Sequence, residues 1–75
     1  MTIDEFVKAF AAEFENTPEE DFKADTEYKT LDEWDSLAVL SIISMIDEQL
    51  EKKVTGADLR TCTTIEDLFN LVNSK

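Results

Sequence analysis

Ser36, in the tripeptide Asp35-Ser36-Leu37, is the residue of this chain that is best placed for covalent chemistry. It opens the longest run of helical apolar periodicity, so its hydroxyl is expected at a helix N-terminus. A serine acts as a nucleophile only when a neighbouring base, most often a histidine, removes its proton. The chain has no histidine, and 75 residues leave little room for a cleft that would desolvate a lysine instead. We therefore interpret Ser36 as a site that other enzymes modify; the alternative is an ordinary helix start.

The many carboxylates of the chain do not form a recognisable metal site. An EF-hand loop needs acids at alternating positions, a central glycine and a closing glutamate. The acidic segment from Asp21 to Glu33 lacks that pattern, and the only glycine is Gly56. A zinc site is excluded because the chain has one cysteine, Cys62, and no histidine. No catalytic residue and no metal ligand is therefore predicted.

The charge of the chain restricts its partners. Eighteen acids against seven bases give a formal net charge of −11, which repels nucleic acids and anionic membrane surfaces and favours basic protein partners. The lone Cys62, expected in the core, excludes an internal disulfide. The first residues do not resemble a signal peptide, and no segment approaches the roughly 20 apolar residues of a membrane span. We expect one small domain, monomeric and cytoplasmic.

The first half of the chain predicts one helix and a long loop. Thr2 and Glu5 have capping-box spacing, and the apolar periodicity predicts a helix from Ile3 to about Glu15, which Asn16-Thr17-Pro18 ends. Residues 16–35 are polar and acidic, with a short helical turn expected after Pro18. Loops of this length in small domains are usually functional. Four large apolar residues are expected to hold this loop on the domain: Phe22, Tyr28, Leu31 and Trp34.

The second predicted helix runs from Ser36 to about Lys52. Asp35 suits its N-cap, and Trp34 is expected to pack against Val39 as a hydrophobic staple. At about 100° per residue, one arc of this helix faces the core; it contains Val39, Ile42, Ile43, Ile46 and Leu50. The opposite side contains Leu37, Leu40, Ser41, Ser44, Asp47, Glu48 and Glu51.

The C-terminal third predicts a loop followed by a weak helical turn over residues 55–60, and then a last helix. Thr63 and Glu66 have capping-box spacing, and Ile65, Leu68, Phe69 and Val72 give the last helix its apolar stripe. One glycine and one proline argue against a β-rich fold. The fold class is therefore all-α, a small antiparallel bundle of three main helices and one short helix.

Over nearly its whole length the chain resembles the acyl carrier protein family. The resemblance rests on Asp35-Ser36-Leu37, the apolar arc of the second helix, acidic Asp47-Glu48, and Thr63-Thr64 before the last helix. The spacing from Ser36 to Thr63-Thr64 matches the family without gaps, and the first helix and long acidic loop match as well. The tripeptide is a weak motif, whereas the full register is specific.

The resemblance implies that Ser36 accepts 4′-phosphopantetheine from coenzyme A through a separate, magnesium-dependent phosphopantetheinyl transferase. The attached arm would end in a thiol that holds acyl or aminoacyl groups as thioesters for loading and transferring enzymes. Asp35 would help to dock the transferase or coordinate its metal, and the core would shelter the acyl chain. The partner-docking face would have an apolar part, Leu37 and Leu40, and a charged part that meets basic patches on partners: Asp47, Glu48 and Glu51.

Two departures from the family pattern favour a dedicated pathway over housekeeping fatty acid synthesis. Glu33-Trp34 replaces the small or glycine-containing stretch before the aspartate, and Ala38 and Ser41 replace residues that are often acidic. Candidate pathways are polyketide, lipid-modification, aminoacyl and surface-glycan synthesis. The rival hypothesis is a small acidic helical adaptor that is never modified.

Overall fold

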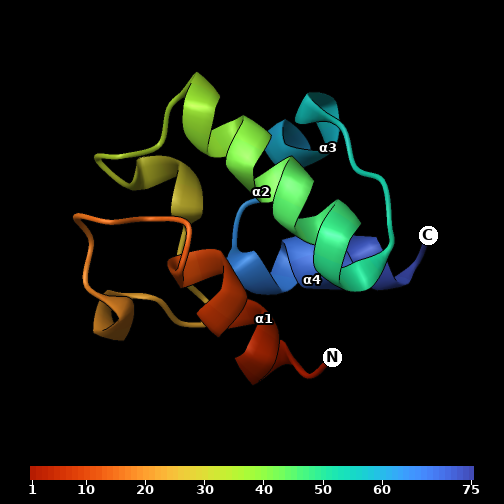
Figure 1. The fold of residues 1–75 in the computed structure, drawn as a ribbon, viewed down its shortest axis with the longest axis horizontal. Helices are drawn as coiled ribbons and strands as arrows, with labels where there is room; N and C mark the ends of the chain where they lie inside the picture. Colours follow the sequence, from red (N-terminus) through yellow and green to blue (C-terminus); the bar gives the residue numbers. More distant parts are fainter.

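The chain folds into helices of different lengths that are joined by loops, and it has no strand (Figure 1). The computed structural model describes all 75 residues. The elements follow in the order α1 (Ile3–Ala11), the 3-10 helices η1 (Glu19–Asp21) and η2 (Tyr28–Thr30), α2 (Ser36–Leu50), α3 (Gly56–Thr61) and α4 (Ile65–Asn73). The predicted all-α class, with three main helices and one short helix, is confirmed. No helix combines the length and apolar composition that spanning a bilayer requires.

Three helix pairs build the bundle: α1 contacts α2 and α4, and α2 also contacts α3. In Figure 1, α2 runs in the opposite direction to α1, and the connection between them fills one side of the molecule. The N-terminal end of α2 lies far from both chain termini in this view. The end of α2 that begins with Ser36 is therefore presented at one extremity of the domain.

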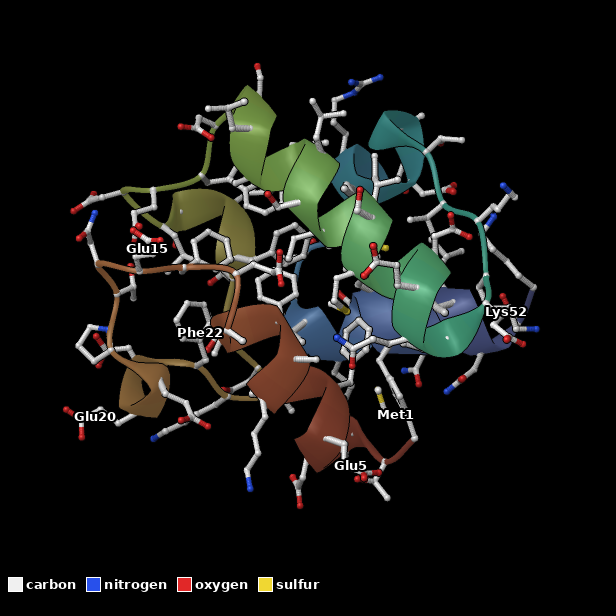
Figure 2. The ribbon with its side chains drawn as sticks, viewed as in Figure 1. Met1, Glu5, Glu15, Glu20, Phe22 and Lys52 are labelled. Atoms are coloured by element: carbon white, nitrogen blue, oxygen red, sulfur yellow. The ribbon has the colours of Figure 1, made fainter.

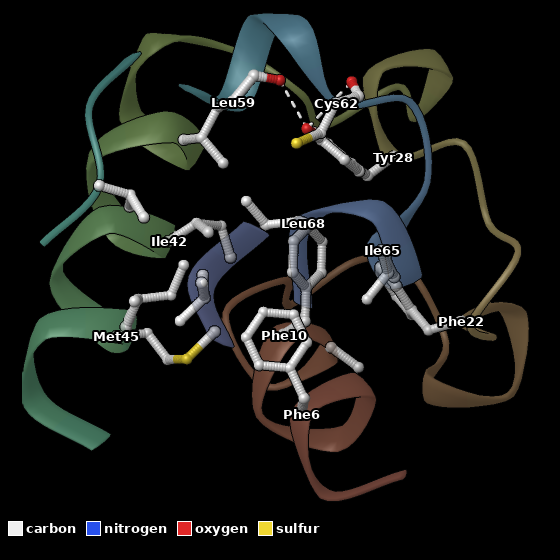
Figure 3. Close-up of a cluster of buried hydrophobic side chains, with 14 of the residues drawn as sticks. Phe6, Phe10, Phe22, Tyr28, Ile42, Met45, Leu59, Cys62, Ile65 and Leu68 are labelled. Atoms are coloured by element: carbon white, nitrogen blue, oxygen red, sulfur yellow. Dashed lines mark hydrogen bonds between the residues drawn. The ribbon is translucent and has the colours of Figure 1, made fainter. Parts of the chain in front are cut away.

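A single hydrophobic core joins the four α-helices and η2 (Figure 3). No buried polar side-chain atom in it lacks a hydrogen-bond partner. Its fully buried members come from both halves of the chain: Phe6, Phe10, Tyr28, Ile42, Ile46, Leu59, Ile65, Leu68 and Val72. Cys62 is also buried, as predicted.

Aromatic packing holds the long connection on the bundle, as the sequence predicted. The Phe10 ring lies 5.5 Å from that of Tyr28, 6.1 Å from that of Phe22 and 6.3 Å from that of Trp34, centroid to centroid. Trp34 is half-buried and packs edge-on against Tyr28 at 4.8 Å. The residues just before Ser36 are thus fixed, while the staple between Trp34 and Val39 stays a prediction.

The first two helices end earlier than the sequence predicted. α1 stops at Ala11 instead of Glu15, because the N–H groups of Glu13 and Phe14 bond three residues back and tighten the chain into turns. α2 stops at Leu50 instead of Lys52, because Glu51 adopts the left-handed conformation with φ 56°. The extended segment that follows allows Val54 to enter the core.

The N-terminal caps of α3 and α4 differ from what the sequence predicted. The capping box of α4 pairs Thr64 with Asp67, not Thr63 with Glu66. α3 is the predicted short helix; it spans Gly56–Thr61 and begins at a capping box, Thr55 with Asp58, that was not predicted from the sequence. Thr/Asp pairs serve here in the place of the more familiar Thr/Glu.

The core-facing side of α2 is rotated from the predicted arc. Ile42 and Ile46 are fully buried as predicted, but Val39, Ile43 and Leu50 are only partly buried. Met45, outside the predicted arc, is 3% exposed. The reason is that α2 contacts α1 on one side and α3 on the other, so its buried surface is set by both neighbours.

Candidate functional site

Asp35 fixes the backbone at the start of α2. Its extended conformation and its carboxylate make it the N-cap: Asp35 Oδ1 accepts a 2.8 Å hydrogen bond from the Ala38 N–H. The Asp35 carbonyl accepts the first helical bond, from the Val39 N–H. The N–H groups of Ser36 and Leu37 make no hydrogen bond within the chain. Two unpaired donors and the positive end of the helix dipole therefore surround Ser36, which is a favourable environment for a phosphate.

The Ser36 hydroxyl is exposed and free. Of the 12 serines and threonines of the chain, eight use their hydroxyl groups in hydrogen bonds within the fold. The other four are Ser36, Ser41, Ser44 and Thr63. Ser41 and Ser44 lie inside α2 and Thr63 precedes the cap of α4, so only Ser36 is the first residue of a helix. Its position fits a covalently attached phosphate group.

Two leucines beside Ser36 face solvent. The Leu37 side chain is 73% exposed and Leu40 is 60% exposed, more than any other large apolar residue of the chain. Neither belongs to the core, so the fold itself does not require a leucine at either position. The predicted exposure of both residues is confirmed.

The acidic residues predicted on the same helix are also exposed. Asp47, Glu48 and Glu51 make no hydrogen bond and no ion pair, since the only ion pair of the domain joins Lys75 to Asp58. Their charges are therefore available to an external partner. Because the overall charge is −11, that partner would be basic.

An open groove of about 490 Å³ runs along α2 from Leu37. Its lining is Glu13, Leu37, Leu40, Ser41, Ser44, Met45, Glu48 and Gln49. Of the predicted docking residues, the groove brings together the two leucines and Glu48, whereas Asp47 and Glu51 lie outside it. Glu13, Met45 and Gln49 also line the groove and were not predicted; the place of Glu13 depends on how the chain continues after α1.

A second groove, of about 800 Å³, lies between α1 and η1, and none of its lining residues belongs to α2. Figure 2 shows Glu20 and Phe22 on that side of the molecule. Lys8, Lys23, Asp4, Glu19 and Glu20 mix both charges there, so the groove has no preference for one sign of ligand.

The η2 segment attaches the connection to α3 in a way that the sequence did not reveal. The Tyr28 hydroxyl donates to the carbonyl oxygens of Leu59 at 2.5 Å and Cys62 at 3.2 Å (Figure 3). Lys29 Nζ donates to the Arg60 carbonyl at 2.7 Å. The available signal was that a buried tyrosine needs a partner for its hydroxyl. These contacts fix the end of α3 against the segment that leads to Ser36.

Cys62 is unlike the thiol of an attached arm. Burial, helped by the nearby charge of Asp67, raises the pKa of the Cys62 thiol. The thiol therefore stays protonated near neutral pH, and the protonated form is a poor nucleophile.

Comparison with known families decides what kind of domain this is. The family model described as phosphopantetheine attachment site matches residues 5–72. The chain belongs to this family. Members are carriers on which other enzymes act, and 4′-phosphopantetheine is attached to them covalently. Neither the curated proteins nor the solved structures that were compared with the chain gave a match.

Membership confirms the resemblance to acyl carrier proteins and makes the chain a phosphopantetheine-dependent carrier. The residues at the start of α2 suit the group: a free hydroxyl, two unpaired N–H donors and an open surface at Leu37. When attached, the arm supplies the thiol that forms thioesters. The chain itself contributes a capped helix end with an exposed serine as its first residue.

Proposed function

We propose that this protein is an acyl or aminoacyl carrier whose 4′-phosphopantetheine is attached to Ser36. The observation that supports this residue is its combination of an exposed, unbonded hydroxyl with the unpaired N–H groups at the start of α2. Inside the transferase, Ser36 Oγ displaces adenosine 3′,5′-bisphosphate from coenzyme A. The new Oγ–P bond replaces a diphosphate P–O bond, and the hydroxyl proton goes to a base of the transferase.

Asp35 has two roles in this proposal. It caps α2, as its bond to the Ala38 N–H shows, and its remaining carboxylate surface contacts the transferase or its magnesium ion. Because Asp35 is exposed and in no ion pair, its charge is available for that contact.

The outer side of α2 is the docking face for partner enzymes in our proposal. Leu37 and Leu40 provide apolar area beside Ser36, and the acids Asp47, Glu48 and Glu51 meet arginine and lysine side chains. Exposed apolar side chains rimmed by free charges are typical of a docking surface. The acids raise the association rate with basic partners, and the leucines add the contact area.

We place the carrier in a dedicated pathway. Glu33 and Trp34 have internal roles, since the Glu33 carboxylate accepts hydrogen bonds from Asn16 and Thr17 and Trp34 packs on Phe10. Ala38 packs against the core, whereas the Ser41 hydroxyl makes no hydrogen bond within the fold, so Ser41 supports the proposal more directly. Ordinary rates with the enzymes of a reconstituted fatty acid elongation cycle would contradict it.

The test is an intact mass after incubation with coenzyme A, magnesium and a broad-specificity phosphopantetheinyl transferase. We expect the wild type to gain the mass of one phosphopantetheine, and Ser36→Ala to gain nothing. Ser44→Ala, which removes another free hydroxyl from the same helix, is the matched control and gains the full mass. Asp35→Asn keeps a good N-cap but loses the charge, so its modification slows while its stability stays close to wild type.

The unmodified adaptor makes the opposite prediction for this experiment. If several transferases leave the wild type unchanged and Ser36→Ala has no effect on function, Ser36 is only part of a helix start. Circular dichroism of Ser36→Ala checks that its fold is intact, because a surface change of this kind alters stability by about 0.5 kcal/mol or less.

A further inference from the structure

The geometry points to the groove along α2 as a resting site for the prosthetic arm and the first part of its acyl chain. In this state the arm folds back from Ser36 over the outer side of α2, towards Gln49. The inference rests on the proposed attachment at Ser36 and adds a location for what is attached. It differs from the expectation that the core between the helices shelters the chain.

The groove starts next to Ser36 and follows one helix. Its α2 residues recur at spacings of three and four, so they form a continuous stripe that begins at Leu37 and ends at Gln49. Met45, only 3% exposed, is its most deeply buried side chain, and Glu13 approaches from beyond the end of α1. No other element crosses in front of α2 in the view of Figure 1.

The order of polar and apolar groups in the groove matches the order in the arm. After its phosphate, pantetheine has a dimethyl-substituted carbon, then two amides, and then the thiol or thioester. From Ser36 onward the groove has Leu37 and Leu40, then Ser41 and Ser44, then Met45, and at its far end Glu48 and Gln49; Glu13, after α1, completes the lining. The hydroxyl groups of Ser41 and Ser44 make no hydrogen bond within the fold, so they are free for the two amides.

The lengths also agree. Ser36 and Met45 are nine positions apart, which is about 14 Å along a helix that rises 1.5 Å per residue. From Ser36 Oγ to its sulfur the arm has about 14 bonds, or nearly five peptide-like units of three bonds, and at about 3.5 Å for each extended unit it reaches about 16 Å, enough to span this distance with a slight bend. The sulfur of a folded-back arm thus reaches Met45, whose thioether suits an apolar or thioester neighbour.

The arm and the docking face share Leu37, Leu40 and Glu48. A partner that covers these residues displaces the arm from the groove, so docking and presentation of the thioester become one event. Between encounters, the groove shields the thioester from water along one side.

The experiment compares amide chemical shifts of ¹⁵N-labelled protein in its apo, holo and octanoyl forms, each verified by intact mass. We expect the octanoyl form to shift the amides of Ser44, Met45 and Gln49 several-fold more than those of Val54 and Leu59. Larger shifts at Val54 and Leu59 would place the chain in the core, and shifts confined to the neighbours of Ser36 would leave the arm in solvent. Either result would overturn the inference that the arm rests in the groove, and the proposed attachment at Ser36 would still stand. Failure to load the wild type overturns both proposals.

A variant that blocks the groove distinguishes chemical-shift changes caused by direct contact with the arm from indirect ones. Ser44→Tyr fills the middle of the groove, so we expect the octanoyl-induced shifts at Met45 and Gln49 to fall several-fold in protein whose loading at Ser36 is verified by intact mass. Asn70→Tyr adds the same side chain at an exposed position of α4, outside the groove, and leaves the shifts unchanged. Equal shifts in the two variants would overturn the inference.

Discussion

Both sides of α2 carry aliphatic residues, but these residues have opposite surroundings. On the inner side, Ile42 and Ile46 are fully buried against neighbouring helices; on the outer side, Leu37 and Leu40 are 73% and 60% exposed. Aliphatic residues on the inner side contribute the burial that stabilises a small domain. Those on the outer side contribute almost nothing to folding. The difference teaches that an apolar residue on the side of a helix that faces away from the core is a candidate for contact with a binding partner.

The largest effect is expected from truncating one aliphatic residue on each side. Ile46→Ala leaves a cavity and lowers the free energy of unfolding by about 2–5 kcal/mol. Leu40→Ala changes it by about 0.5 kcal/mol or less but weakens binding to the transferase. Urea unfolding measures the first quantity, and the KM of the transferase reports the second. Equal destabilisation by the two variants would break the comparison between the sides.

The next effect tests how α3 is held beside the inner side of α2. Tyr28→Phe removes the donor for the Leu59 and Cys62 carbonyls, which costs about 1–3 kcal/mol of unfolding free energy. Hydrogen exchange of the α3 amides should accelerate most. Lys29→Met, which removes the exposed bond to Arg60, is the control and should have a much smaller effect. An unchanged exchange rate in Tyr28→Phe would show that packing alone holds α3.

A smaller effect is expected from reversing one charge on the outer side. Glu48→Lys should reduce the association rate with a basic partner several-fold, and the reduction should shrink as salt is added, because exposed charges are screened. Glu66→Lys is the control, because it makes the same charge reversal at an exposed position of α4 and not on α2. Stopped-flow association at two ionic strengths is the measurement. Equal reductions in both variants would mean that net charge alone matters.

The smallest effect distinguishes acids that the fold uses from acids that it leaves free. Backbone and side-chain hydrogen bonds with Thr2 lower the pKa of Glu5. A lowered folded-state pKa stabilises the fold above the unfolded value of 4.5, and this contribution disappears as pH falls through the folded value. Glu5→Gln keeps a capping-box partner without titrating, so its stability should fall less than that of the wild type as the pH drops below 4.5. Thermal unfolding across that range checks it; parallel curves would contradict it.

Local patterns predicted much of this structure. The capping box of α1, the Asp35 cap, the turn after Pro18 and the exposure of Leu37 and Leu40 all depend on residues within a few positions of one another. The hydroxyl of Ser36 was predicted at a helix N-terminus for the same reason. Helix C-termini were harder to predict. Glu51 ends α2 in a left-handed conformation, and the sequence has no glycine there to indicate it.

The sequence by itself determined the helices, the caps of α1 and α2, the single core and the serine at the start of α2, because these follow from periodicity, capping chemistry and composition. Only the tertiary structure decided which side of α2 is buried, how Tyr28 fixes α3, and that Glu13 lines the same groove as Met45 and the leucines. Such contacts join residues far apart in the chain. The physical reason is that a helix has one periodicity but several neighbours, and the packing against each neighbour sets the final rotation of its surface.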